Sequence, residues 1–281
     1  MHTLSKTTIA LTLLITLCQP CQANVIYAVD DIGSDDSQLV RMERNGDTFS
    51  ITNIGMKYRN ADIEGISFLP GTDKLYAVGG ENGRSFDKTF YIWDINTGLL
   101  TSIGTIGGVT NPFAGRDIIA AAFRPTDSTF WISVEDAGLY EMNINTLGVT
   151  LRSDDSIFTT GSGAEGLAWS ADGQTLLASA GSWLYDVNYS DGSTSALHKI
   201  GHSIGGLGFD FIGNLYATDS ENVTQLTVNG GSWSHEHITS ELPGRRDIEA
   251  ITAIRWVVPE PATLSLLTLG GLAMVRRRHK A

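Results

Sequence analysis

The amino-acid sequence predicts an all-β protein folded as a β-propeller, most simply one with five four-stranded blades. Three observations support this prediction. A unit of four short β-rich runs recurs along residues 24–258, its copies begin 40 to 55 residues apart, and turn-forming pairs such as Asp-Gly and Pro-Gly separate the runs. Glycine accounts for 31 of 281 residues, which fits a chain with many turns.

The spacing of the repeat sets the number of blades. Positions equivalent to Glu64 fall at residues 64, 119, 165, 205 and 249, so successive copies are separated by 55, 46, 40 and 44 residues. Repeats of this length with four strands each are typical of propeller blades. Six blades are the alternative, and they would require two units to be merged within the first spacing of 55 residues.

The last copy of the repeat is incomplete. It opens at Asp247–Ile251 and then runs into the C-terminal region before a second strand can form. At the other end of the chain, Val25–Val29 matches the second strand of another copy, Leu75–Val78, and residues 38–42 and 48–54 supply two further strands. We therefore expect the N-terminal strands to complete the last blade, which closes the ring and covers sheet edges that would otherwise stay open.

The body of the chain is similar to known propeller families in architecture. The stretch Trp93-Asp94-Ile-Asn-Thr-Gly98 resembles the strand ending of WD-type repeats, and the recurring Leu-Tyr pairs resemble lactonase-like propellers. The resemblance covers the whole body and implies a fold. It implies no activity, because propellers carry many unrelated functions.

Residues 1–23 have the pattern of a secretory signal peptide. Lys6 precedes an apolar run over residues 9–17, and Cys21-Gln22-Ala23 places small residues where a signal peptidase requires them, so we expect cleavage between Ala23 and Asn24. A lipoprotein signal is the alternative, but Leu17 and Pro20 precede the two cysteines where that signal has a small residue. Both cysteines lie in this segment, so the predicted propeller domain, residues 24–256, contains none.

Residues 257–281 form a tail with three parts. Pro259-Glu260-Pro261 is followed by the uncharged stretch 262–275 and then by Arg276, Arg277 and Arg278. The uncharged stretch alone is short for a membrane span of about 20 residues, and counting from Val257 makes it long enough only if Glu260 and two prolines are tolerated at its outer end. By the positive-inside rule, these arginines indicate that the C-terminus lies on the cytoplasmic side of the membrane. We predict a short transmembrane helix here, and a permanent anchor is the alternative to a processed one.

This tail resembles the PEP-CTERM sorting signal of exported proteins from Gram-negative bacteria. The matching elements are the Pro-Glu-Pro triplet, the apolar segment with Gly270-Gly271, and the arginine cluster. The resemblance implies an exosortase as partner, a transient tether to the inner membrane, and delivery to the cell surface or the extracellular polysaccharide matrix. It therefore implies a localisation of the protein and no activity.

The charge of the chain limits its partners. The formal net charge is −12, with 19 basic and 31 acidic residues, and the two ends hold five of the basic residues but only one of the acidic ones. The predicted propeller is therefore strongly acidic, which argues against nucleic acid as a ligand because phosphate binding requires a basic surface.

Acidic residues recur where the inner strand of a predicted blade begins. The inner strands surround the central channel, so these carboxylates are expected to converge on it, and oxygen ligands of this kind suit Ca²⁺. The alternative is that the aspartates cap loops and the glutamates meet backbone groups or Arg116, Arg245 and Arg246. The candidate channel carboxylates are Asp62, Glu64, Asp117, Glu165, Asp247 and Glu249.

His235 and His237 form a second candidate metal pair. They are two residues apart and therefore on one face of a strand. No histidine elsewhere in the sequence has a spacing that marks it as a third ligand, so the pattern favours an exposed pair on an edge strand.

The sequence indicates a non-enzymatic binding or interaction module with a polysaccharide or protein ligand, and no catalytic residues are assigned. The alternative is a Ca²⁺-dependent hydrolase of the lactonase or esterase type that uses channel carboxylates such as Glu64, Glu165 and Glu249.

Overall fold

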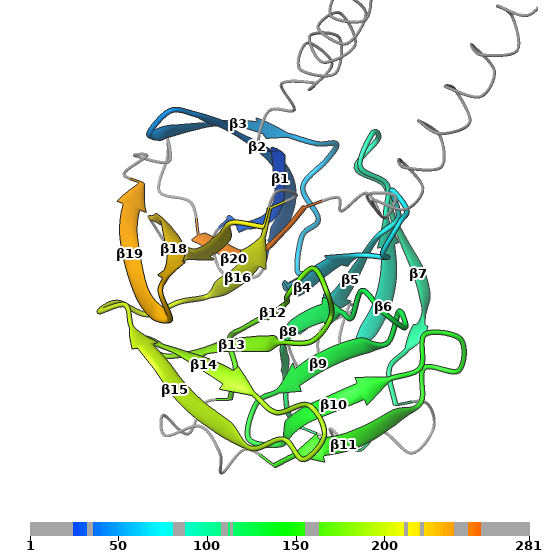
Figure 1. The fold of residues 1–281 in the computed structure, drawn as a ribbon. Helices are drawn as coiled ribbons and strands as arrows, with labels where there is room; N and C mark the ends of the chain where they lie inside the picture. The colour runs from blue at the N-terminus through cyan, green and yellow to red at the C-terminus, as the bar shows by residue number, and fades with distance from the viewer. Residues whose placement is uncertain are drawn as a thin grey trace, which may run out of the picture.

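The computed structural model describes residues 25–32, 36–80, 88–107, 112, 115–154, 163–210, 213–219, 222–238 and 247–253. Twenty β-strands in these ranges form five antiparallel sheets of four strands, arranged as a ring (Figure 1). The predicted five-bladed propeller is confirmed, and the six-bladed alternative is wrong, because the 55-residue first spacing contains a single blade with longer connections. The signal peptide and the sorting tail lie outside the described residues.

Four blades are continuous in sequence. The first blade is β4 (Ile63–Phe68), β5 (Leu75–Gly79), β6 (Thr89–Trp93) and β7 (Leu100–Thr105). The second blade is β8 (Ile118–Phe123), β9 (Phe130–Val134), β10 (Gly138–Met142) and β11 (Val149–Ser153). The third blade is β12 (Gly166–Trp169), β13 (Leu176–Ala180), β14 (Trp183–Val187) and β15 (Thr194–Lys199). The fourth blade is β16 (Gly206–Phe209), β17 (Leu215–Thr218), β18 (Val223–Asn229) and β19 (Ser232–Ile238).

The fifth blade, here the closing blade, joins the two ends of the propeller. Its strand order is β20 (Asp247–Thr252), β1 (Val25–Asp31), β2 (Ser37–Asn45) and β3 (Thr48–Asn53). The inner strand β20 therefore comes from the C-terminal side and pairs with β1 from Tyr27 opposite Thr252 to Asp31 opposite Asp247. This is the predicted closure by the N-terminal strands.

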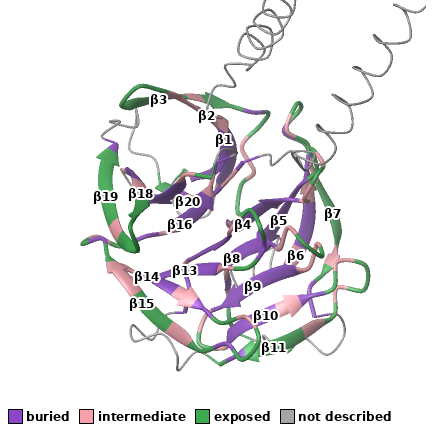
Figure 2. Cartoon of the chain, in the orientation of Figure 1, coloured by how far each residue is buried: buried purple, intermediate pink, exposed green. Residues whose placement is uncertain are grey.

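The hydrophobic core lies between neighbouring blades. Strands near the axis are almost wholly buried, whereas the outer strands β3, β7, β11, β15 and β19 are largely exposed (Figure 2). Between the first and second blades, for example, the buried ring of Phe130 meets Phe90 at 5.1 Å and Phe123 at 4.6 Å, both edge to face. Each blade therefore buries its faces only against its two neighbours, so the ring must close for every face to be covered.

Candidate functional site: the two ends of the channel

The five inner strands β4, β8, β12, β16 and β20 surround the axis, each beside the next, with β20 beside β4. They approach so closely that a Cβ added to Gly65 would lie 2.7 Å from the backbone nitrogen of Ala121 in the next inner strand. A side chain at the start of one inner strand can therefore reach the equivalent side chain of the adjacent blade.

A β-bulge at the start of the inner strands explains the 64, 119, 165, 205 and 249 repeat. In β4, β8 and β20 the register shifts around Glu64, Ile119 and Glu249, so each is an extra residue without a partner in the next strand. In the third and fourth blades Glu165 and Gly205 hold the same place, because their amides bond the carbonyls of Ser179 and Thr218 just before the regular ladder begins. A bulge re-aims the side chain of the extra residue.

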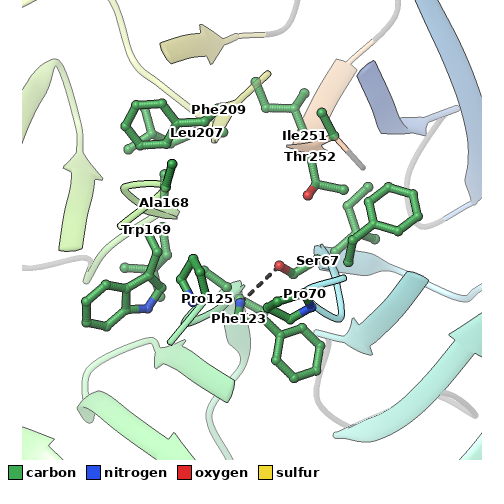
Figure 3. A pocket seen from close by; sticks show the side chains of 18 of the residues that line it. Ser67, Pro70, Phe123, Pro125, Ala168, Trp169, Leu207, Phe209, Ile251 and Thr252 are labelled. Atoms are coloured by element: carbon green, nitrogen blue, oxygen red, sulfur yellow. Dashed lines mark hydrogen bonds between the residues drawn. The ribbon is translucent and has the colours of Figure 1, made fainter. Parts of the chain in front are cut away.

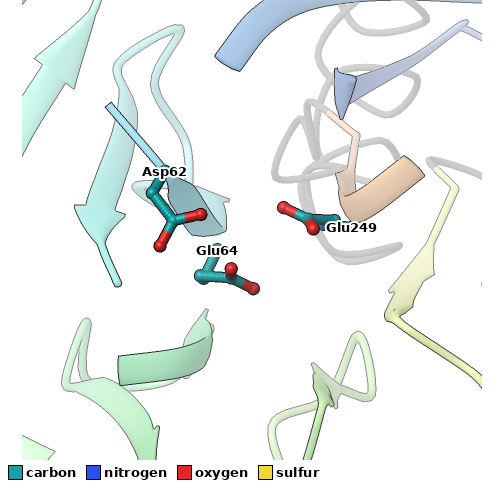
Figure 4. A group of neighbouring side chains, drawn as sticks. All are labelled: Asp62, Glu64 and Glu249. Carbon is teal, nitrogen blue, oxygen red and sulfur yellow. The ribbon is translucent and has the colours of Figure 1, made fainter. Parts of the chain in front are cut away.

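Three of the six predicted carboxylates come together at this end of the channel. Oxygens of Asp62, Glu64 and Glu249 all lie within 4.8 Å of one another (Figure 4). Asp62 and Glu64 come from the first blade and Glu249 from the closing blade, and each residue is half-buried. Among the described residues, the Oε2 atom of Glu249 is buried without a hydrogen-bond partner. We call these three residues the carboxylate cluster.

The environment of the carboxylate cluster opposes negative charge. Burial raises the pKa of Glu64 well above its ordinary value, and the charges of Glu249 and Asp62 raise it further. Burial, followed by the charge of Asp31 and then that of Asp62, raises the pKa of Glu249 to about 9. Without a cation, the cluster is therefore expected to retain protons at neutral pH, and a bound cation would have to displace them.

Asp31 also contributes negative charge to the surroundings of the carboxylate cluster, and the sequence analysis did not predict this. It ends β1, opposite Asp247 in β20, and its charge raises the pKa of both Glu64 and Glu249. The predicted closure of the ring could have indicated the position of Asp31. If Val25–Val29 pairs with the last inner strand, the next two residues, Asp30 and Asp31, must lie near the start of that strand.

The other three predicted carboxylates do not join the cluster. Asp247 is exposed at the start of β20. Glu165 belongs to the third blade, which borders neither blade of the cluster, and its Oε2 lies 3.5 Å from the Oγ of Ser203. Burial raises the pKa of Glu165. Asp117 is half-buried in the second blade, where the bulge residue is Ile119 rather than an acid.

The alternative of loop-capping aspartates and of glutamates that meet backbone groups or arginines stays a prediction. The backbone carbonyl of Asp62 accepts a hydrogen bond from Gly80 at 2.7 Å, and the Asp62 side chain is hydrogen-bonded to Glu64. Arg245 and Arg246 lie outside the described residues.

Gly80 provides the space for the Glu64 side chain. A Cβ at residue 80 would lie 2.3 Å from the Cγ of Glu64 and 2.9 Å from the carbonyl oxygen of Ile118. We expect Gly80→Ala to reduce the free energy of unfolding by about 1–3 kcal/mol, as overpacking does. In a Glu64→Ala background the cost should fall by about 1 kcal/mol, because one of the two clashes is gone. Urea unfolding of the four variants measures this coupling, and strictly additive effects would place the Glu64 side chain elsewhere.

The opposite end of the channel is apolar. A cavity of about 690 Å³ lies where the inner strands end, and all five blades contribute to its wall (Figure 3). The wall combines small residues such as Ala168 with aromatic ones such as Phe209, and Asp172 is its one charged residue among those described. The Asp172 carboxylate already accepts hydrogen bonds from Ser170 and Gln174. The sequence analysis did not predict this cavity.

Comparison with known proteins decides the nature of the tail. Residues 257–278 match the PEP-CTERM protein-sorting motif. The chain thus carries a PEP-CTERM sorting motif. This motif marks proteins that are exported and sorted at the membrane in Gram-negative bacteria, and it implies recognition by an exosortase. Within the described ranges no helix is long and apolar enough to cross a membrane, and the predicted span of the PEP-CTERM tail lies outside them.

One solved structure with a TM-score above 0.5 supports the fold of the chain. A protein of unknown function from Bacteroides thetaiotaomicron VPI-5482 matches with a TM-score of 0.54 and 15% identity, over 82% of this chain and 64% of that one. The extracellular domain of a hybrid two-component system from B. thetaiotaomicron matches with a TM-score of 0.44 and 13% identity, over 80% of this chain and 34% of that one. The chain thus spans less than two thirds of each. Among curated proteins, none is similar enough in sequence to match.

Proposed function

We propose that the exported propeller is a non-enzymatic binding module that acts at the cell surface or in the extracellular matrix. The observation that carries this proposal is the cavity at the end of the inner strands. Its volume of about 690 Å³ is within the range of small-molecule and side-chain binding sites, and every blade contributes to it.

The chemistry of the wall favours an apolar protein segment over a polysaccharide. A sugar chain buries many hydroxyl groups, and each requires a hydrogen-bonding partner. The polar side chains in the wall are Ser67, Thr126, Asp172 and Thr252. The Oγ of Ser67 already accepts a hydrogen bond from the Phe123 amide, at 3.0 Å. An apolar side chain from a partner protein requires no such partners.

The uncharged dye N-phenyl-1-naphthylamine tests this proposal as a stand-in for an apolar group. We expect one dye molecule to bind per chain, with increased fluorescence, and Thr252→Trp to weaken binding by at least about tenfold because it fills the cavity. Thr252 is half-buried at the cavity wall. Thr227→Trp, at an exposed position of β18 that does not line the cavity, is the matched control and should bind as the wild type does.

Two results would overturn this proposal. One is a wild-type protein that leaves the dye unbound. The other is a Thr252→Trp variant that folds and binds dye as tightly as the Thr227→Trp control.

The carboxylate cluster supports a further part of the proposal, a bound divalent cation. Three carboxylates with oxygens within 4.8 Å suit Ca²⁺, which is bound by six to eight oxygen ligands, some of them water. In a binding module this cation would neutralise the cluster and join the first blade to the closing blade.

The same cluster favours a second candidate function, a Ca²⁺-dependent lactonase or esterase. The two functions differ in the effect of Glu64→Gln and Glu249→Gln. A hydrolase would cleave p-nitrophenyl esters or lactones in the presence of Ca²⁺ and lose this activity in both variants. A binding module would show no such hydrolysis, while dye binding at the other end of the channel would remain intact in both variants.

A further inference from the structure

The histidines of this chain are gathered in one place. Four of the six, His198, His202, His235 and His237, lie together where the third and fourth blades meet. His198 is on β15, His202 is in the segment that leads to β16, and His235 and His237 are on β19. The remaining two, at positions 2 and 279, lie in the terminal segments outside the described residues.

The four rings form a continuous series of contacts. The centroids of His198 and His235 are 5.1 Å apart, those of His235 and His237 are 5.3 Å apart, and those of His237 and His202 are 4.9 Å apart. The Nε2 atom of His198 lies 2.8 Å from the Nδ1 atom of His235. The neighbouring blade thus places a third histidine, His198, beside the pair on β19, which the spacing in the sequence did not indicate.

These separations are those of imidazole ligands on one metal ion. Two imidazole nitrogens about 2.05 Å from a tetrahedral metal are about 3.3 Å apart, and their ring centroids are about 5.2 Å apart. The ring centroids already have this spacing, whereas the Nε2 of His198 and the Nδ1 of His235, 2.8 Å apart, would have to separate. In the present arrangement three ring nitrogens do not converge within 4.8 Å, so the rings must turn on binding. His235 and His237 are exposed and His198 is half-buried, which leaves them room to turn.

Polar groups beside the rings support ligation. The Oδ2 atom of Asp219 lies 3.3 Å from the Nε2 atom of His202, and the Oγ1 atom of the buried Thr224 lies 3.0 Å from the Nδ1 atom of His237. Such contacts orient ligand rings in metal sites.

We propose that His198, His235 and His237 bind a transition-metal dication of the Zn²⁺, Ni²⁺ or Cu²⁺ type at the junction of the third and fourth blades. Imidazole ligands select this class over Ca²⁺ and Mg²⁺. His202, held by Asp219, packs against the ring of His237 and supports its orientation. The site is separate from the carboxylate cluster in both position and chemistry, and the solvent-exposed side of the rings leaves a coordination position open for water.

Isothermal titration of the full-length protein with ZnCl₂ tests the proposal, using protein purified with an affinity tag that contains no histidine. We expect one Zn²⁺ per chain, with a dissociation constant in the micromolar range or below, and at least about tenfold weaker binding in each of His198→Gln, His235→Gln and His237→Gln. Glu236→Gln is the matched control: it lies between the two histidines on the opposite face of β19 and should bind Zn²⁺ as the wild type does. All variants keep His2 and His279.

Circular dichroism and melting temperatures confirm that each variant is folded. The proposal is overturned if the wild type binds no Zn²⁺, Ni²⁺ or Cu²⁺, or if a folded His235→Gln or His237→Gln variant binds Zn²⁺ as tightly as Glu236→Gln. Tight binding that survives His198→Gln would overturn the three-histidine site, because the ligands would then come from β19 alone.

Discussion

In the absence of divalent cations, the protein is expected to lose about 2–4 kcal/mol of unfolding free energy as the pH rises from 5 to 8. The pKa of Glu249 is raised to about 9 in the folded chain, whereas in the unfolded chain the carboxyl titrates near its ordinary value of 4.5. Between these values the folded state retains a proton that the unfolded state has released. The contribution of Glu249 to stability is therefore fully present below its unfolded pKa of 4.5 and declines with increasing pH, by about 1.4 kcal/mol per unit.

Calcium should reverse this loss. The proposed Ca²⁺ ion would take the place of the protons among Asp62, Glu64 and Glu249, so millimolar Ca²⁺ is expected to raise the unfolding free energy at pH 8 and to have little effect at pH 5. Urea unfolding between pH 5 and 9, with EDTA or CaCl₂, measures both effects.

Two variants sharpen the pH experiment. Glu249→Gln should flatten the pH dependence, because the neutral amide releases no proton, and should abolish most of the Ca²⁺ effect. Glu236→Gln removes an exposed carboxylate on β19 and should leave both unchanged. A wild-type protein whose stability rises between pH 5 and 8 without cations would show that the carboxylate cluster is not protonated as inferred.

A chain that begins at Asp36 is expected not to fold, whereas one that begins at Val25 should fold normally. The shorter chain lacks β1, the strand between β20 and β2 in the closing blade, whose residues 26–30 are fully buried. Without it the inner strand β20 has no partner in its sheet, and the faces of the first and fourth blades lose their cover. The loss exceeds what a domain of this size can tolerate, because native stabilities are only about 5–15 kcal/mol.

Near-ultraviolet circular dichroism and limited proteolysis distinguish the two truncated chains. The chain that begins at Val25 should give the near-ultraviolet spectrum of a folded protein and should resist the protease. The chain that begins at Asp36 should show neither property. Cooperative unfolding of the shorter chain would mean that the ring tolerates an open blade.

The repeat made most of the fold predictable, for a physical reason. Each inner strand begins at the same place in its blade, and positions 64, 119, 165, 205 and 249 mark that place, three of them as bulges. The last copy of the repeat is incomplete, and the strand Val25–Val29 belongs to no other copy. Pairing the two is the arrangement that completes every blade. The count was uncertain only at the first spacing, where the extra length lies in connections rather than strands.

The sites were harder to predict because they depend on which blades are neighbours. Glu64 and Glu249 meet because the first and closing blades adjoin, whereas Glu165 has the same place in its repeat but lies in a blade that touches neither. His198 meets His235 for the same kind of reason, since the outer strands of adjacent blades come together without any fixed spacing in the sequence. The cavity is hard to predict because aromatic residues in its wall, such as Phe123 and Trp169, also belong to the core between blades, so their pattern in the sequence is that of core residues.

A crystal structure at pH 8 with CaCl₂, measured at a wavelength where calcium scatters anomalously, tests most directly the central claim that the acidic end of the channel holds a cation. We predict an anomalous peak among Asp62, Glu64 and Glu249, about 2.3–2.6 Å from their oxygens. An absent peak, with these carboxyl groups hydrogen-bonded to one another at pH 8 in excess calcium, would contradict it.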